Sequence, residues 1–195
     1  LAVHCATPYA QGLGFRSAPV DPVLVFHSVF GKTVPDISLN AIANLGYANG
    51  RFGVAVYAGD TLATVSRVLG VKQNRDGQTG VVYVHSVGRN QHGDLVLEYV
   101  RWVMVRKRDP ASPAPEAVVP ELPESVAPSA MTAPVHLATH AVHTELSGSP
   151  HLFEDYAVGE RIDHVDAMTI EESDHMMAAR LFQNTARVHF NQHVE

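Results

Sequence analysis

An apolar helix signal near the start of the chain limits the possible folds more than any other feature. Asp21-Pro22 is a helix start, since aspartate is a good N-cap and proline suits the first helical position. Gly31 is placed to end this helix. The residues between are apolar almost all the way round: Val23, Leu24, Val25, Phe26, Val29 and Phe30. A helix without a polar face is buried, so the rest of the chain must enclose it.

The chain after this helix has the pattern of an antiparallel sheet. Four segments have strand character, at 51–57, 61–71, 80–87 and 95–105. They are separated by turn sequences, namely Gly59-Asp60, Asn74-Arg-Asp-Gly77 and Asn90-Gln-His-Gly93. Short turns between consecutive strands imply antiparallel neighbours. The sequence therefore predicts an α+β arrangement, in which an antiparallel sheet wraps around one central helix.

The chain divides into three zones. Residues 1–109 form the first domain. Residues 110–150 hold eight of the twelve prolines and no Lys or Arg, which predicts an extended, irregular linker. In residues 151–195, Thr169-Ile-Glu-Glu172 is a capping box that predicts a helix from Ile170 to about Phe182. This last zone is near the smallest size that folds alone, roughly 40–60 residues. We expect it to open a second domain, and we expect both ends of the chain to be truncated.

Composition excludes several classes of function. Hydrophobic residues make up 46% of the 195 residues, which suffices for a packed core. The formal charge of −6 argues against sequence-independent binding to the phosphate backbone of nucleic acid. No apolar run approaches the roughly 20 residues of a membrane helix. Cys5 is the single cysteine, so no internal disulfide can form, which fits a reducing compartment. We expect no nucleic-acid partner, no membrane association and a cytoplasmic location.

Two partial copies of one motif resemble the MaoC-like hydratase/dehydratase family, whose members carry Asp-x-Asn-Pro-x-His after a short helix. The first copy is His4-Cys-Ala-Thr-Pro-Tyr-Ala10, leading to Gly14-Phe15. The second copy is Gln183-Asn-Thr-Ala-Arg-Val-His-Phe-Asn191. The resemblance implies the hot-dog fold, an antiparallel sheet around a central helix, in a double hot-dog arrangement. Residues 1–109 would then be most of the first hot-dog and residues 151–195 the opening of the second.

Three further segments are similar to the mesaconyl-CoA hydratases (β-methylmalyl-CoA dehydratases) of this family, at 30–46, 99–109 and 180–192. The resemblance implies an acyl-CoA hydro-lyase that converts β-methylmalyl-CoA to mesaconyl-CoA (2-methylfumaryl-CoA) reversibly, without a cofactor beyond the CoA of its substrate. It also implies a homo-oligomer, because hot-dog sheets commonly pair edge to edge. Three alternatives stay open: another (R)-specific enoyl-CoA hydratase of the family, a non-catalytic hot-dog that binds acyl-CoA, and a thioesterase.

The resemblance also suggests the catalytic residues. His189 occupies the family's histidine position, and the ordinary histidine pKa of about 6.5 suits a general acid/base. Asn184 occupies the aspartate position. An amide cannot take a proton at working pH, but it can hold a water through its carbonyl and donate through its NH₂ group. We predict that Asn184 orients the water while His189 moves protons. His4 is the equivalent of His189 in the first copy, and is either structural or catalytic.

Other polar side chains have simpler explanations. His136, His140 and His143 have the spacing of ligands on a helix, but they lie in the Pro-rich zone without a fourth ligand. Solvated side chains are therefore favoured over a zinc site, and we predict no metal. His175 is expected on a helix surface. The basic cluster at 101–108 is either a contact for CoA phosphates or a solvated strand end.

Overall fold

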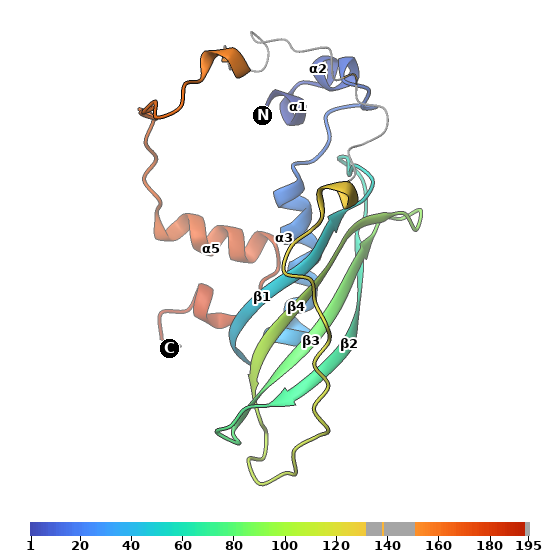
Figure 1. Ribbon diagram of the computed structural model, residues 1–195, viewed down its shortest axis with the longest axis vertical. Helices are drawn as coiled ribbons and strands as arrows, with labels where there is room; N and C mark the ends of the chain where they lie inside the picture. The colour runs from blue at the N-terminus through green and yellow to red at the C-terminus, as the bar shows by residue number, and fades with distance from the viewer. Residues whose placement is uncertain (132–137, 139–150, 194–195) are drawn as a thin grey trace.

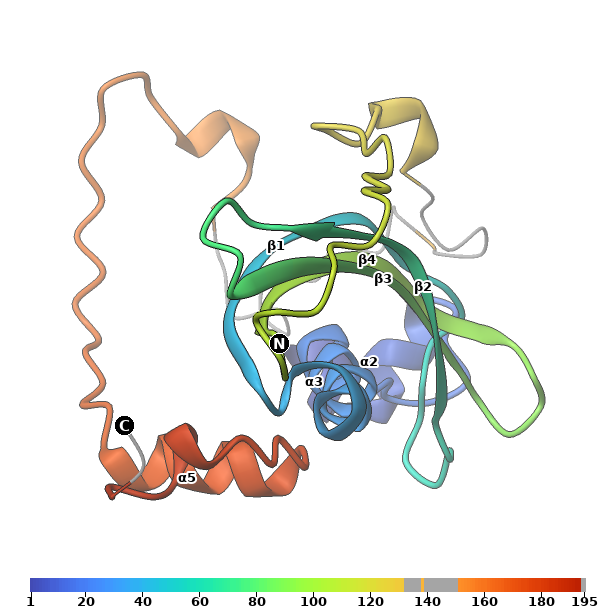
Figure 2. The same cartoon turned by 90° about the horizontal axis from the view of Figure 1, so that it is seen from below.

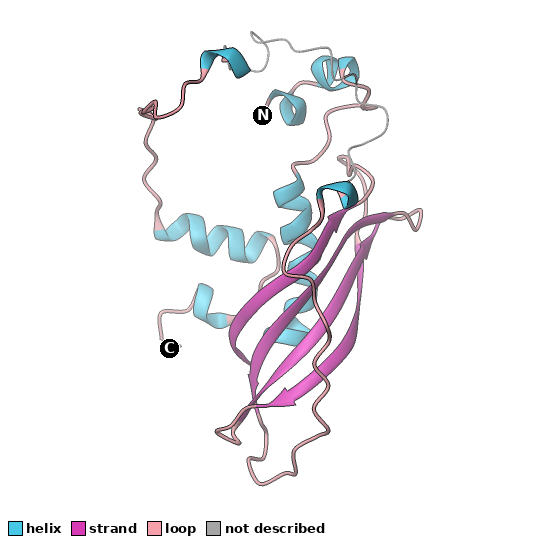
Figure 3. Cartoon of the chain, viewed as in Figure 1, coloured by secondary structure: helices cyan, strands magenta, loops and turns pink. Residues whose placement is uncertain are grey.

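A four-stranded antiparallel sheet forms the body of the computed structural model, which describes residues 1–131, 138 and 151–193 (Figures 1 and 3). Its strands are β1 (Ala41–Phe52), β2 (Ala63–Gln73), β3 (Thr79–Arg89) and β4 (Leu95–Arg106), in the order β1-β4-β3-β2. The sheet curves around one helix, α3 (Pro22–Thr33), which lies on its concave side (Figure 2). The predicted α+β arrangement is therefore confirmed, and β2, β3 and β4 form the predicted meander.

The position of the first strand was predicted wrongly. The sequence predicted a strand at 51–57 that leads into the next one, whereas β1 covers 41–52 and pairs with β4. The segment 53–62 crosses to β2 at the opposite edge of the sheet. Strand β1 is rich in Ala, Asn and Gly, which have low strand propensity, so its pairing with β4 decides its conformation.

Helix α3 begins as predicted and ends later. The Asp21 side chain accepts a hydrogen bond of 2.8 Å from the Val23 backbone N–H, as an N-cap should. The helix does not end at Gly31 but runs to Thr33 and into a π-helical turn, Val34–Ser38. Val29 is fully buried against the sheet, whereas Val23 is 60% exposed. The sheet covers only one side of α3, so the prediction of a helix buried all round is wrong within the described residues.

A buried arginine joins the sheet to the end of α3. Arg101 of β4 has no exposed surface and donates hydrogen bonds to Thr33 Oγ1 at 2.8 Å and to Ser38 Oγ at 3.3 Å. Its guanidinium carbon lies 4.6 Å from the centre of the Phe30 ring. Burial lowers the pKa of Arg101. For this residue, both interpretations of the basic cluster are wrong, because alternate strand residues face opposite sides and Arg101 faces inward.

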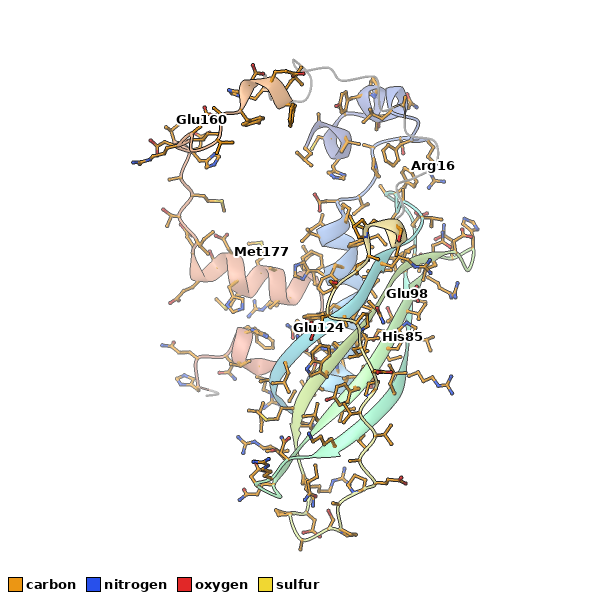
Figure 4. All side chains as sticks on the ribbon, viewed as in Figure 1. Arg16, His85, Glu98, Glu124, Glu160 and Met177 are labelled. Atoms are coloured by element: carbon orange, nitrogen blue, oxygen red, sulfur yellow. The ribbon has the colours of Figure 1, made fainter. Side chains whose placement is uncertain are left out.

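The segment 110–131 lies over the convex face of the sheet (Figure 2). The Val118 backbone N–H donates to the Val71 carbonyl at 2.9 Å, which fixes this segment along β2. Glu98 accepts hydrogen bonds from Arg51 Nε at 2.8 Å and lies 3.2 Å from His85 Nε2. Figure 4 shows His85 and Glu98 on neighbouring strands of this face. These charged groups lie on the side of the sheet away from α3.

Short helices precede and follow the sheet. At the N-terminal side they are α1 (Ala2–Cys5) and α2 (Thr7–Gly12). After the sheet they are η2 (Pro128–Ala130), η3 (Phe153–Asp155), α5 (Glu172–Leu181) and η4 (Arg187–His189). Across the described residues, no helix combines the length and the apolar character that crossing a membrane requires.

The capping box of α5 was predicted two residues too early. The cap is Glu171, whose backbone N–H donates to Asp174 Oδ2 at 3.1 Å, and the helix begins at Glu172. The sequence contains two overlapping patterns with an acidic residue three positions after the cap, starting at Thr169 and at Glu171. The shorter carboxylate of Asp174 reaches back to its cap, so the second pattern is the one that forms.

Gly88 offers a test of the packing between the helix and the sheet. A Cβ atom at Gly88 of β3 would lie 2.6 Å from Val29 Cγ2 and 2.9 Å from Val29 Cγ1. We expect Gly88→Ala to lower the free energy of unfolding of the complete protein by about 1–3 kcal/mol, because Val29 must move. Denaturant unfolding measures this loss. Gly50→Ala on β1 is the matched control, since none of the residues that the structure describes lies within 4 Å of its Cβ position. Equal effects of both changes would contradict the expected close packing.

Candidate active site

The two predicted site residues line one cavity of about 260 Å³ between α3 and α5. Asn184 and His189 follow α5 in the chain, and Phe30 of α3 and Tyr47 of β1 line the opposite wall. Figures 1 and 2 show α5 beside α3, beyond the β1 edge of the sheet. Residues that are more than 130 positions apart in the sequence therefore share one cavity.

A glycine allows the segment with the site residues to approach α3 closely. Gly31 is buried, and its missing Cβ leaves room for the backbone carbonyl of Phe182. Lys32 Nζ donates to Gln183 Oε1, and Gln183 adopts a positive φ of 58° directly after the helix end. The Asn184 backbone N–H then donates to the Ala179 carbonyl at 2.8 Å. The C-terminal end of α5 therefore fixes where Asn184 lies.

Asn184 is held by its own loop. Its Oδ1 atom accepts a hydrogen bond of 3.3 Å from the Ala186 backbone N–H. A carbonyl oxygen has a second lone pair, so it can still accept from a water molecule. The NH₂ group has no hydrogen-bond partner within residues 1–131, 138 and 151–193. The side chain can therefore both accept from and donate to a molecule in the cavity.

His189 lies on η4, where a second histidine contacts it. His189 Nδ1 is 3.1 Å from His175 Nε2, and the two ring centroids are 5.1 Å apart at an angle of 70°. Burial lowers the pKa of His189, and the nearby His175 lowers it further. His189 therefore stays neutral to lower pH than an exposed histidine, as a general base requires.

His175 was missed as a site residue. The sequence placed it on a helix surface, and its side chain is exposed, but it also lines the cavity and contacts His189. Helical spacing could have found it, because positions 175, 179 and 182 follow the pattern i, i+4, i+7 along one face of α5. Ala179 on that face is buried, and Phe182 lines the same cavity.

His4 lies at a different site, in a largely apolar cavity of about 450 Å³ near the start of α3. Its Nδ1 atom is 3.0 Å from the Pro19 carbonyl oxygen, and its Nε2 atom is 3.6 Å from Asp21 Oδ2. Both ring nitrogens thus face oxygen atoms of the protein. This geometry supports the structural interpretation of His4, in which it ties the N-terminal segment to the cap of α3.

The sequence predicted no metal site, and only the described part of the chain bears on this prediction. His136, His140 and His143 lie outside the described residues. Within the part of the chain that the structure describes, no group of three or more His, Cys, Asp or Glu side chains is arranged to hold a metal ion.

Comparisons with known proteins identify similar sequences over the whole chain. The sequence profile of the mesaconyl-CoA hydratase family matches residues 3–128, which include the sheet but neither Asn184 nor His189. A β-methylmalyl-CoA dehydratase of Chloroflexus aurantiacus is 64% identical over 194 residues, 100% of this chain and 55% of the relative. A mesaconyl-CoA hydratase of Cereibacter sphaeroides is 56% identical over 190 residues, 97% of this chain and 55% of the relative. The chain thus spans about half the length of these relatives.

Solved structures agree with the fold. The crystal structure of a MaoC domain protein dehydratase from Chloroflexus aurantiacus matches with a TM-score of 0.90 at 64% identity, over 100% of this chain and 55% of that one. A Mycobacterium tuberculosis protein described as a double hotdog fold matches with a TM-score of 0.70 at 21% identity, over 97% of this chain and 58% of that one. The predicted hot-dog fold is confirmed.

Gly31 provides a test of how the site is assembled. We expect Gly31→Ala to displace the backbone at Phe182, and with it Asn184 and His189, since the added Cβ would overlap the Phe182 carbonyl. Small displacements of catalytic groups can reduce rates about 100-fold, so a loss of about 10- to 100-fold in kcat/KM is expected. For the hydration proposed below, steady-state turnover of an enoyl-CoA by the complete protein measures this loss. Gly12→Ala is the control, because no described residue lies within 4 Å of its Cβ position. Full activity of Gly31→Ala would show that this close approach is not needed.

The lowered pKa of His189 predicts a pH dependence. An NMR titration of the His189 ring, assigned by its absence in His189→Gln, should give a midpoint below about 6.5. Between about pH 6.5 and the lower folded pKa, the unfolded chain binds more protons at this residue than the folded chain. The free energy of unfolding should therefore fall as the pH drops from about 6.5 through the folded pKa. His189→Gln should remove this contribution, and a midpoint above 6.5 would contradict the burial argument.

Proposed function

The chain belongs to the mesaconyl-CoA hydratase family, and from this premise we propose that it serves the reversible hydration of mesaconyl-CoA to β-methylmalyl-CoA. The names of the two relatives support this substrate pair. The observation that carries the chemistry is the shared cavity of Asn184 and His189, in which burial lowers the pKa of the histidine. Such a perturbed group in a concave site is what acid/base catalysis requires.

The reaction needs one proton to move within the site. Hydration adds a hydroxyl group to the β-carbon of the enoyl thioester and a hydrogen to its α-carbon. In the proposed mechanism, the neutral His189 ring takes a proton from the attacking water and then gives this proton to the α-carbon. His189 alone accepts and returns the proton, so Asn184 does not have to act as a base. Dehydration follows the same steps in reverse.

Asn184 would orient the attacking water and stabilise the negative charge that develops on the thioester oxygen. Its carbonyl oxygen can accept from the water O–H, and its NH₂ group is available to a second group in the cavity. As the water attacks, the thioester oxygen takes on enolate charge, and an oriented donor there is worth roughly 3–4 kcal/mol. We propose that the NH₂ group either supplies such a donor or holds the water in line.

The alternatives differ in what they require of the site. A non-catalytic acyl-CoA-binding module is compatible with the missing aspartate, but it does not need a partly buried histidine with a lowered pKa. A thioesterase would use similar groups and would release CoA. Another (R)-specific enoyl-CoA hydratase would share the mechanism and differ in the acyl group. The identity of 64% to a β-methylmalyl-CoA dehydratase supports the proposed substrate over these alternatives.

The wider setting of the enzyme is also a proposal. The chemistry above uses only water and protein side chains, so we propose no cofactor besides the CoA of the substrate. An acyl-CoA substrate and a lone cysteine support a cytoplasmic location. We propose further self-association through a sheet edge. Its support is the part of the edge strand β2 that exposes Val65 and Val68 by 74% and 59%, away from Val71, to which Val118 is hydrogen-bonded.

Two substitutions test the proposal. With mesaconyl-CoA offered to the complete protein, loss of the conjugated thioester absorbance measures hydration. We expect His189→Ala to lower kcat/KM by about 100- to 10,000-fold, the usual contribution of a general acid/base. Asn184→Asp should keep the activity, and its negative charge should raise the pKa of His189 and shift the pH profile upward.

The same assay separates the alternatives. Nearly full activity of His189→Ala would refute the role of His189. Release of free CoA thiol would indicate a thioesterase. Binding of enoyl-CoA without any turnover would indicate a binding module, and a preference for another enoyl-CoA would change the substrate but not the mechanism.

A further inference from the structure

The contact between His175 and His189 restricts the protonation of both rings. Two nitrogens 3.1 Å apart share one hydrogen, so one donates and the other accepts. If His189 Nδ1 donates, then its Nε2 atom carries a free lone pair. If His175 Nε2 donates, then the neutral His189 ring carries its hydrogen on Nε2 and cannot take another proton there. The direction of this one hydrogen bond therefore decides whether His189 Nε2 can act as a base.

No other hydrogen bond to the His189 ring competes with this contact among residues 1–131, 138 and 151–193. The hydrogen bond made by one ring nitrogen of a histidine sets which nitrogen is protonated. In many catalytic histidines this partner is a carboxylate or a backbone carbonyl. Here it is the imidazole ring of His175, held on α5 one turn before the buried Ala179.

An imidazole partner has a consequence that a carboxylate would not have. A carboxylate beside His189 would stabilise the imidazolium and raise its pKa. A second histidine disfavours a charge on its neighbour, in the same direction as burial. The pair can fix the ring of His189 without making it a stronger base, which suits a group that must both take a proton and give it back.

We propose that His175 is a positioning residue for the hydration reaction: its Nε2 atom accepts from Nδ1–H of His189 and so leaves His189 Nε2 free to exchange the proton between water and the α-carbon. This inference rests on the proposed function. The proton balance of the hydration is unchanged, because the hydrogen on His189 Nδ1 stays in the hydrogen bond to His175 throughout the reaction. His175 acts through His189 and does not itself contact the reacting atoms.

The test combines kinetics with a direct measurement of the tautomer. His175→Leu removes the acceptor, and we expect kcat on mesaconyl-CoA to fall about 100-fold or more while KM changes less than about 3-fold; loss of the correct tautomer in a serine-protease triad costs about 10,000-fold. His175→Gln keeps an acceptor oxygen near the position of Nε2 and should recover kcat to within about 10-fold of the unmodified protein. Met177→Gln is the matched control, because Met177 is a 65% exposed residue of the same helix (Figure 4).

Nitrogen-15 NMR of the ring resonances, with His189 assigned by its loss in His189→Gln, should show the Nδ1–H tautomer in the unmodified protein and its loss in His175→Leu. The Nε2–H tautomer in the unmodified protein would overturn the proposal, even where His175→Leu does not fold. So would an unchanged kcat in His175→Leu, or equal losses in His175→Leu and Met177→Gln. Failure of the unmodified protein to hydrate mesaconyl-CoA would refute the proposed function alone, since the tautomer measurement does not depend on turnover.

Discussion

The packing of α3 into the concave face of the sheet is the interaction on which the rest of the structure depends. Val29 of the helix is fully buried against Gly88 of β3, so the two elements approach as closely as a missing side chain allows. Arg101 then fastens the end of the helix to β4 through Thr33 and Ser38. These contacts fix the position and the direction of α3. They leave one of its sides uncovered by the sheet, and Phe182 and Gln183, directly after α5, contact that side.

The candidate active site exists because of this uncovered side. Gly31 on α3 admits the backbone of Phe182, and the turn at Gln183 then directs Asn184 and η4 back toward the helix. A cavity with an aromatic wall of α3 and β1 results, and the polar groups facing it come from α5 and the loop after it. The first motif copy has no such arrangement, since both ring nitrogens of His4 face protein oxygen atoms.

The cavity between α3 and α5 is lined by apolar, aromatic, amide and imidazole side chains. No carboxylate is among the described residues that line the cavity between α3 and α5. The amide of Asn184 lines the cavity, and the imidazole of His175 contacts the proposed base. Burial and the nearby His175 both lower the pKa of His189, so its neutral form is favoured. The proposed proton transfer therefore starts from an uncharged base.

Local patterns in the sequence determined several features by themselves. Asp21 caps α3 because its side chain bonds within the same turn, and Gly77 and Gly93 mark the hairpins because glycine adopts the positive φ found there without steric cost. The motif at 183–191 placed Asn184 and His189 close together because few residues separate them. Tertiary structure decided what depends on distant partners: the pairing of β1 with β4, the inward direction of Arg101, the packing of Gly31 and the contact of His175 with His189. A one-dimensional pattern records the preferences of neighbouring residues. It does not record which surfaces meet once an apolar helix has been enclosed.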